Sequence, residues 1–218
     1  MQTRIARIFK ELVHHFPYAA VGVAACLGIL LGIEKAGWRP AGTTSFHIFH
    51  PIHLFLSGAV TTAMFYEYEK RHFKTVAVKA MVVGFFSTFP ICSLSDVFIP
   101  YLGGLLWKTP VQFHLCAIEE PWLVFPASFA GIIFGVLFLR WVEKGTEIFH
   151  PFHVLVSSLA SLLYLASFDV ALWQESAVVP FIITLIAVWV SCCFSDIIFP
   201  LWFVGMKAPC CGHHPHDY

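Results

Sequence analysis

Two pairs of histidines, each with a proline after its first member, are the residues of this sequence best suited to chemistry. The chain reads FHPIH at 49–53 and FHPFH at 149–153, so the pair recurs after one hundred residues. Residues three apart share a face of a helix, so His50 and His53 would point together. Imidazole is the commonest metal ligand among side chains. Each histidine pair is therefore a candidate for half of a metal site.

A second motif recurs with the same offset and would supply the remaining ligands. The chain reads CSLSDVFIP at 92–100 and CCFSDIIFP at 192–200. In each copy the first Cys and the Asp lie four residues apart and share a helical face. A carboxylate in an apolar segment also needs a neutralising partner, and a bound cation would serve. The sequence thus predicts two pseudo-symmetric metal sites, each with a serine beside the ligands: His50, His53, Cys92 and Asp96 with Ser95, and His150, His153, Cys192 and Asp196 with Ser195.

The ligand types indicate a divalent transition metal. Nitrogen, sulfur and oxygen ligands together favour zinc, and iron, manganese, copper, cobalt and nickel remain open. The C-terminal segment KAPCCGHHPHDY is rich in the same types, which is typical of metal binding. Its candidate ligands are Cys210, Cys211, His213, His214 and His216.

The connection before the fourth apolar run carries further polar residues. Glu119 and Glu120 precede a helix start, where acidic side chains are favourable. With His114 and Cys116 they could also gather cations at an outer vestibule.

The histidine pairs have two other interpretations. If His50 lies at the start of a helix, the free N–H groups there favour a phosphate or carboxylate, although the nearby aspartates would repel an anion. Histidines, Ser and Asp can also simply cap helix ends. The recurrence of both motifs in the same order favours the metal interpretation.

Composition places these motifs in a membrane. The 218 residues are 58% hydrophobic and only 12% charged, whereas a soluble domain has about a quarter charged residues. Several apolar runs reach the roughly 20 residues needed to cross a bilayer. We predict an all-α integral membrane protein with six transmembrane helices, over 13–33, 48–68, 78–101, 121–142, 148–168 and 177–204. Prolines at 100 and 200 predict that the third and sixth are interrupted near Ser-Asp.

The six spans form an internal duplication. The second and third spans recur with an offset of 100 residues, and the first recurs with an offset of 109, as Phe16-Pro17 and Phe125-Pro126 show. Three spans per copy is an odd number, so the second copy would enter the membrane from the opposite side. We therefore predict two inverted repeats, 1–110 and 111–206, followed by the cytoplasmic tail 207–218.

Charge sets the predicted orientation. Ten of the thirteen Lys and Arg residues fall on the side of the N-terminus, and the other three are Lys35, Arg39 and Lys108. The positive-inside rule then places both termini in the cytoplasm, at the inner membrane if the source is prokaryotic. The zero net charge gives no indication of a nucleic-acid partner, and the seven cysteines do not form a disulfide pattern.

Inverted repeats with intramembrane ligands are typical of secondary transporters. The first prediction is a transporter of divalent transition-metal ions that works by alternating access, with protons coupled through its histidines and aspartates. The alternatives are a membrane-embedded metalloenzyme or redox-complex subunit acting on a lipid or quinone, and a scaffold subunit of a larger complex. Predicted partners are the lipid bilayer, metal ions, and a second copy or a membrane-complex subunit.

Overall fold

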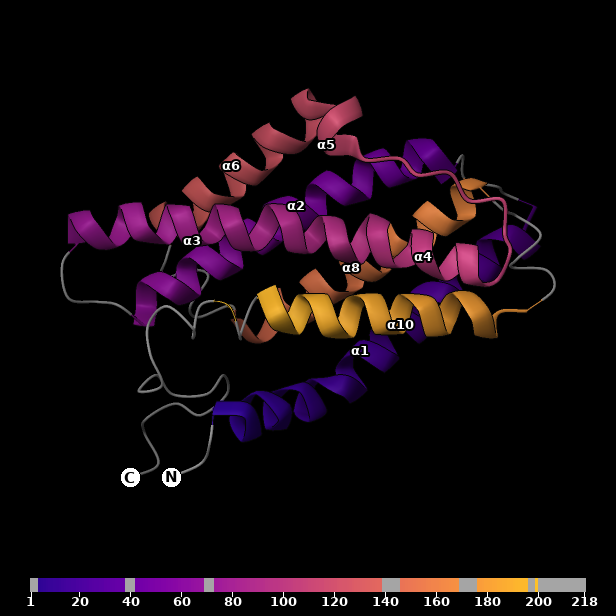
Figure 1. Ribbon diagram of the computed structural model, residues 1–218, viewed down its shortest axis with the longest axis horizontal. Helices are drawn as coiled ribbons and strands as arrows, with labels where there is room; N and C mark the ends of the chain where they lie inside the picture. The colour runs from indigo at the N-terminus through magenta and orange to yellow at the C-terminus, as the bar shows by residue number, and fades with distance from the viewer. Residues whose placement is uncertain are drawn as a thin grey trace.

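The apolar runs fold as helices because a backbone shielded from water must satisfy its own hydrogen bonds. The computed structural model describes residues 4–37, 42–68, 73–138, 146–168, 176–195 and 199, and none of these residues forms a strand. Figure 1 shows the resulting bundle. Its elements are α1 (Arg4–Lys35), α2 (Gly42–Tyr68), α3 (Phe73–Ser93), the π-helical turn η1 (Leu94–Phe98), α4 (Ile99–Leu106), α5 (Cys116–Glu119), α6 (Pro121–Leu137), α8 (Thr146–Phe168) and α10 (Val178–Cys193).

Four helical stretches are long and apolar enough to cross a membrane, and α6 and α10 are shorter apolar helices. The prediction of an all-helical protein with membrane-spanning helices is confirmed in this form. The four stretches are Leu12–Lys35, Gly42–Tyr66, Val76–Leu106 and Pro151–Phe168.

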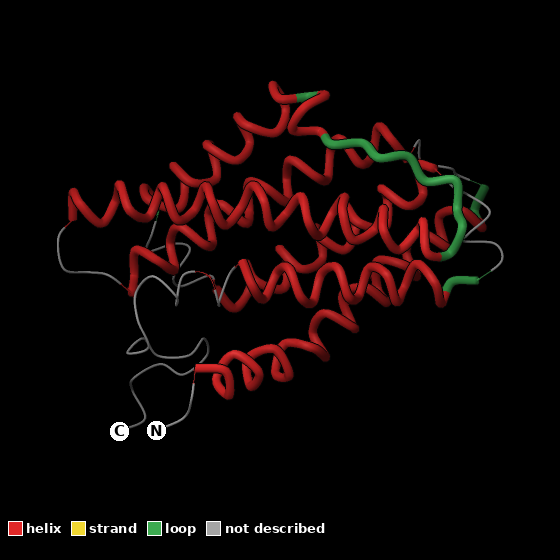
Figure 2. Tube along the Cα trace, in the orientation of Figure 1, coloured by secondary structure: helices red, strands yellow, loops and turns green. Residues whose placement is uncertain are grey.

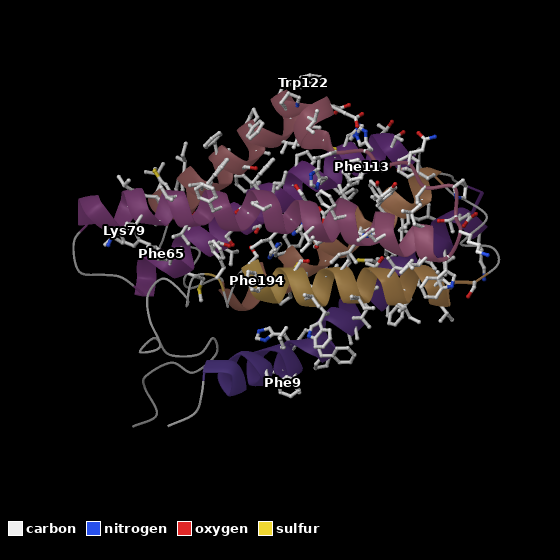
Figure 3. All side chains as sticks on the ribbon, in the orientation of Figure 1. Phe9, Phe65, Lys79, Phe113, Trp122 and Phe194 are labelled. Atoms are coloured by element: carbon white, nitrogen blue, oxygen red, sulfur yellow. The ribbon has the colours of Figure 1, made fainter. Side chains whose placement is uncertain are left out.

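Side chains are distributed as a bilayer requires. Large apolar residues cover the outside, and Trp122 and Phe9 are 70% and 67% exposed at the edges of the bundle (Figure 3). Hydroxyl groups are instead buried between the helices. A water-soluble protein places these residue types the other way round. Among the fully buried hydroxyl residues are Ser57, Thr61, Ser87, Ser157 and Ser161.

The third span is not broken at its Ser-Asp motif. The helix is continuous from Val76 to Leu106 and widens into the π-helical turn η1 at the motif. Pro100 falls in the first turn of α4, where its missing N–H is tolerated. Residues 194 and 195 are π-helical as well. The predicted interruption is therefore a local change of hydrogen bonding, and such π-turns are frequent at functional sites.

Small residues bring α2 and α6 close together. A Cβ added at Gly131 would meet the backbone carbonyl of Phe55, and one at Gly135 would meet that of Ala59. Their GxxxG pattern therefore makes a contact within the chain. At Gly28 and Gly32, in contrast, an added Cβ would meet nothing within 4 Å.

The two halves of the chain interlock. α1 packs against α8 and α10, α6 packs against α2 and α3, and α2 packs against α8. In Figure 1, α3 and α4 run along the bundle in one direction and α10 runs in the other. Figure 2 shows the long connection between α4 and α5 passing over the end of the bundle where α2 begins.

Candidate metal centre

Two histidines from different halves of the chain meet in the centre of the bundle. His53 on α2 and His153 on α8 are fully buried, and their Nε2 atoms lie 2.7 Å apart. They occupy matching positions, one hundred residues apart. Because α2 begins at Gly42, His53 lies about three turns inside the helix. His50 lies about two turns inside α2, so the prediction that it sits at a helix start is wrong, and the anion interpretation loses its basis on this helix.

A small internal space beside these rings has two-fold character. It is lined by four residues and by their four counterparts one hundred positions later. It has no room for a water molecule. The candidate ligand atoms of His53, Cys92 and His153 lie within 4.8 Å of one another. The lining residues are His53, Ile91, Cys92 and Ser95, with His153, Ser191, Cys192 and Ser195.

The hydroxyl group of Ser191 adds a polar atom to this space. It is buried, and within the described part of the chain it has no hydrogen-bond partner. Cys192, its neighbour, donates a weak bond from Sγ to Ser157 Oγ at 3.3 Å. An orphaned buried hydroxyl is costly, so it marks a place where a ligand would be stabilised.

Asp96 is hydrogen-bonded to the Nδ1 atoms of two histidines of α2, on the side of His53 that is opposite His153. Its Oδ2 accepts hydrogen bonds from His50 Nδ1 at 2.8 Å and from His53 Nδ1 at 2.7 Å. Its Oδ1 accepts one from Ser95 Oγ at 2.8 Å. A carboxylate can only accept, so both Nδ1 atoms carry the proton, and a neutral His53 has its lone pair on Nε2. That lone pair points at His153, which donates the hydrogen bond between the two rings.

Hydroxyl groups tie the two halves together around the centre. Ser161 on α8 donates to the carbonyl of Ser95 at 2.9 Å, and Thr61 on α2 donates to the carbonyl of Ser195 at 3.5 Å. These two bonds are counterparts with the offset of one hundred. Ser87 also donates to the Ser195 carbonyl, at 2.9 Å. The π-turns are thus anchored from the opposite half.

A second cluster lies where α2 begins. His47 and His114 are partly buried, with their Nε2 atoms 2.9 Å apart. His114 Nδ1 lies 2.8 Å from Glu119 Oε2, and His47 Nδ1 lies 3.7 Å from Glu120 Oε1. The candidate ligand atom of buried Cys116 lies within 4.8 Å of those of both histidines.

Burial is the main cause that raises the pKa of the Cys116 thiol to about 12, and the charge of Glu120 adds to it. This thiol is therefore protonated at neutral pH and would become a ligand only if a metal displaced its proton.

The structure brings together most of the predicted ligands that it describes. His50 and His53 are both hydrogen-bonded to Asp96, and the thiol of Cys92 lies beside His53. The sequence predicted two groups of ligands, whereas the described residues His53, Cys92, His153 and Cys192 line one space. Outside the described residues lie the side chain of His150, Asp196, and the tail residues Cys210, Cys211, His213, His214 and His216.

Sequence reasoning missed His47. It lies three residues before His50, which lies three before His53, so the three share one face of α2. The spacing HxxHxxH was the available signal.

No protein family, curated protein or solved structure matches this chain.

Proposed function

We propose that this protein transports divalent transition-metal ions across a membrane, with one ion binding between the two halves of the chain. The observation that carries the proposal is the pair of facing Nε2 atoms of His53 and His153, beside two cysteines in a buried space. Two imidazoles and one or two thiolates form a ligand set that binds zinc in preference to hard cations such as magnesium or calcium. Zinc is thus the favoured cargo.

The proposed site would belong to two inverted three-helix repeats, 1–110 and 111–206. Exchanging each helix for its counterpart converts the contacts of α1 with α8 and α10 into those of α6 with α2 and α3. Gly22 on α1 packs against Val154 and Leu155, as Gly131 on α6 packs against Phe55. Both pairs keep the sequence offsets of the repeat. α3 and α10 also run in opposite directions (Figure 1).

Direct ligands would be the Nε2 atoms of His53 and His153 and the thiolates of Cys92 and Cys192. In a tetrahedral zinc site two nitrogens are about 3.4 Å apart, from bonds of about 2.0–2.1 Å. The two rings would have to separate by less than an ångström from their present 2.7 Å. An entering ion would replace the hydrogen bond between the two Nε2 atoms by two metal–nitrogen bonds.

Asp96 would act on the ion through His53. Metal-bound histidines usually donate their other N–H to a carboxylate, which fixes the tautomer and raises the basicity of the ligand nitrogen. The bonds of Asp96 with His53 and His50 fit this role. A direct bond from Asp96 to the metal, as the sequence suggested, would cost at least one of these interactions.

The burial of the site supports transport over the alternatives. A site buried between the two halves would be closed to both sides of a membrane at once, as the occluded state of an alternating-access cycle requires. An enzyme acting on a lipid or quinone needs room for its substrate, and this space does not admit water. A scaffold subunit would have no use for paired imidazoles and the orphaned hydroxyl of Ser191 there. Coupling to protons and the cytoplasmic location of both termini stay predictions.

Zinc uptake into proteoliposomes would test the proposal. The protein would be the tail-substituted chain, which is the full-length chain with all tail ligands changed to serine: Cys210, Cys211, His213, His214 and His216. We expect zinc to enter vesicles that contain a fluorescent zinc indicator, and His153→Ala to abolish entry. The matched control is His14→Ala, since His14 is exposed on α1 away from the centre. Equal uptake by vesicles with His153→Ala, or no uptake by any of these proteins, would contradict the proposal.

A further inference from the structure

We infer that His47, His114 and Cys116 form a second transition-metal site at the end of the bundle where α2 begins, and that zinc is its natural ion. This cluster is termed the mouth site. The inference goes beyond the proposed function, because an ion could bind here whether or not the central site transports one.

The mouth site repeats the design of the centre with different residues. In both places two Nε2 atoms face each other at hydrogen-bonding distance, 2.9 Å at the mouth and 2.7 Å in the centre. At both, a cysteine lies within reach of the two nitrogens. At both, a carboxylate accepts from Nδ1 of one histidine of the pair, His53 in the centre and His114 at the mouth, which leaves the Nε2 lone pair of that ring for a metal.

The two glutamates give the mouth site its electrostatic character. Glu119 accepts a hydrogen bond from His114 Nδ1, and Glu120 faces His47 Nδ1. Two carboxylates and one thiolate would offset the charge of a divalent cation held by neutral imidazoles. Neither glutamate is buried, so each also remains available to water and to an arriving ion.

The connection between α4 and α5 is fixed in a way that serves His114. The hydroxyl of Tyr164 on α8 donates to the carbonyl of Gln112 at 2.8 Å and accepts from the backbone N–H of His114 at 3.4 Å. Phe113, between Gln112 and His114, also packs on Phe98 and Tyr101, with ring centroids 5.3 Å apart in each pair, and Figure 2 shows the course of this segment over the outside of the bundle. The hydroxyl of Tyr164 thus bonds to the backbone at Gln112 and at His114, and a ligand on a loop requires such support to keep its position.

A row of three histidines on α2 runs from the mouth site to the centre. His47, His50 and His53 are spaced by three residues along α2, and Phe46 stacks on His50 with ring centroids 5.2 Å apart. Side chains of His47 and His114 are 24% and 22% exposed, whereas those of the central histidines are fully buried. We therefore expect an ion at the mouth to exchange with solvent faster than one in the centre.

The same sequence pattern follows the last apolar run. The chain reads K-T-P-x3-H from Lys108 to His114 and K-A-P-x3-H from Lys207 to His213. A histidine thus recurs at a matching place after each Ser-Asp motif. This recurrence is expected if the histidine serves metal binding in both halves.

Cobalt titration of the tail-substituted chain tests the inference, since cobalt takes zinc sites and gives absorption bands that report thiolate ligands. We expect two equivalents to bind. The double variant His47→Ala/His114→Ala should lose one equivalent, and the loss should be of the ion that a chelator removes quickly. The double variant His53→Ala/His153→Ala should keep that fast ion. Cys116→Ser should remove the thiolate band of the fast ion alone.

The matched control is again His14→Ala, which should bind two equivalents. Folding of each variant is checked by circular dichroism and gel filtration. If His47→Ala/His114→Ala keeps both equivalents, or if the only ion lost from it is the slowly released one, the mouth site is refuted while the central site stands. If His53→Ala/His153→Ala still binds two equivalents, the proposed central site fails and the mouth site is judged on its own variants.

Discussion

The substitution Asp96→Asn tests whether the carboxylate of Asp96 orients His53 or binds the metal directly. In the structure Oδ2 of Asp96 accepts N–H groups from two histidines, at 2.7 and 2.8 Å. An amide oxygen at the position of Oδ2 could still accept from both rings, but it would carry no full negative charge. The NH2 group would take the place of Oδ1 and could not accept the hydrogen bond from Ser95 Oγ.

The size of the effect follows from the lost charge. A hydrogen bond to a charged group contributes roughly 1.5–3 kcal/mol and a neutral one roughly 0.5–1.5 kcal/mol, so weakening both histidine bonds costs roughly 2–3 kcal/mol. Each 1.4 kcal/mol is a factor of ten in affinity, so zinc should bind about 10- to 100-fold more weakly. The same range is typical of groups that support a metal-bound histidine. Removing a direct ligand, as in His153→Ala, should weaken binding much more.

Competition against a chromophoric zinc chelator measures this affinity. The background is the tail-substituted chain with His47→Ala and His114→Ala, so that only the centre binds. Glu34→Gln is a matched change of carboxylate to amide on α1, and it should leave the affinity unchanged. Unchanged zinc affinity in a folded Asp96→Asn protein would refute the reasoning. A loss as large as that of His153→Ala would show that Asp96 binds the metal directly.

Three further predictions concern packing and the mouth site. Gly131→Leu should lower the thermal unfolding temperature strongly, because its side chain would meet the backbone of α2, whereas Gly28→Leu should have little effect, because nothing lies within 4 Å of the added Cβ; equal unfolding temperatures would contradict the α2–α6 contact. Tyr164→Phe should weaken cobalt binding at the mouth and leave the central ion in place, since only the anchor of His114 is lost; unchanged binding at the mouth would contradict this anchoring. Burial raises the pKa of Cys116 to about 12, which favours the protonated thiol, so alkylation of Cys116 in the metal-free protein, followed by peptide mass spectrometry, should stay slow between about pH 6 and pH 9 and become fast after denaturation; rapid alkylation of Cys116 in the folded protein would show an exposed thiolate.

Much of the chemistry could be read from the sequence because the two motifs recur with one offset. Hydropathy could predict the helices, and shared helical faces could predict that His50 and His53 meet the Ser-Asp motif. The start of α2 could not be placed, since its first turns contain Gly42, Thr43, Thr44 and Ser45, which have little hydropathy. That error put His50 and His53 at a membrane boundary, and the sequence left open whether the two ligand groups form separate sites or one centre.

The meeting of His53 and His153 could not be predicted for a different reason. It depends on how α2 packs on α8, and residue spacing within a helix carries no information about its neighbours. Local rules also favoured a break at Pro100, whereas the helix continues, with a π-turn at Leu94–Phe98 and Pro100 in the first turn of α4. His47 was within reach of sequence reasoning, but its partner His114 lies on a loop that only tertiary structure brings near.

Zinc stoichiometry in a set of histidine variants tests the central claim most directly. The protein is the tail-substituted chain with His47→Ala and His114→Ala, and its zinc content is measured by elemental mass spectrometry after gel filtration. If His53 and His153 share one ion, the parent binds one zinc, each single alanine variant loses it, and the double variant loses nothing further. If the halves hold separate ions, the parent binds two, each single variant keeps one, and only the double variant is empty; that result would contradict a shared centre.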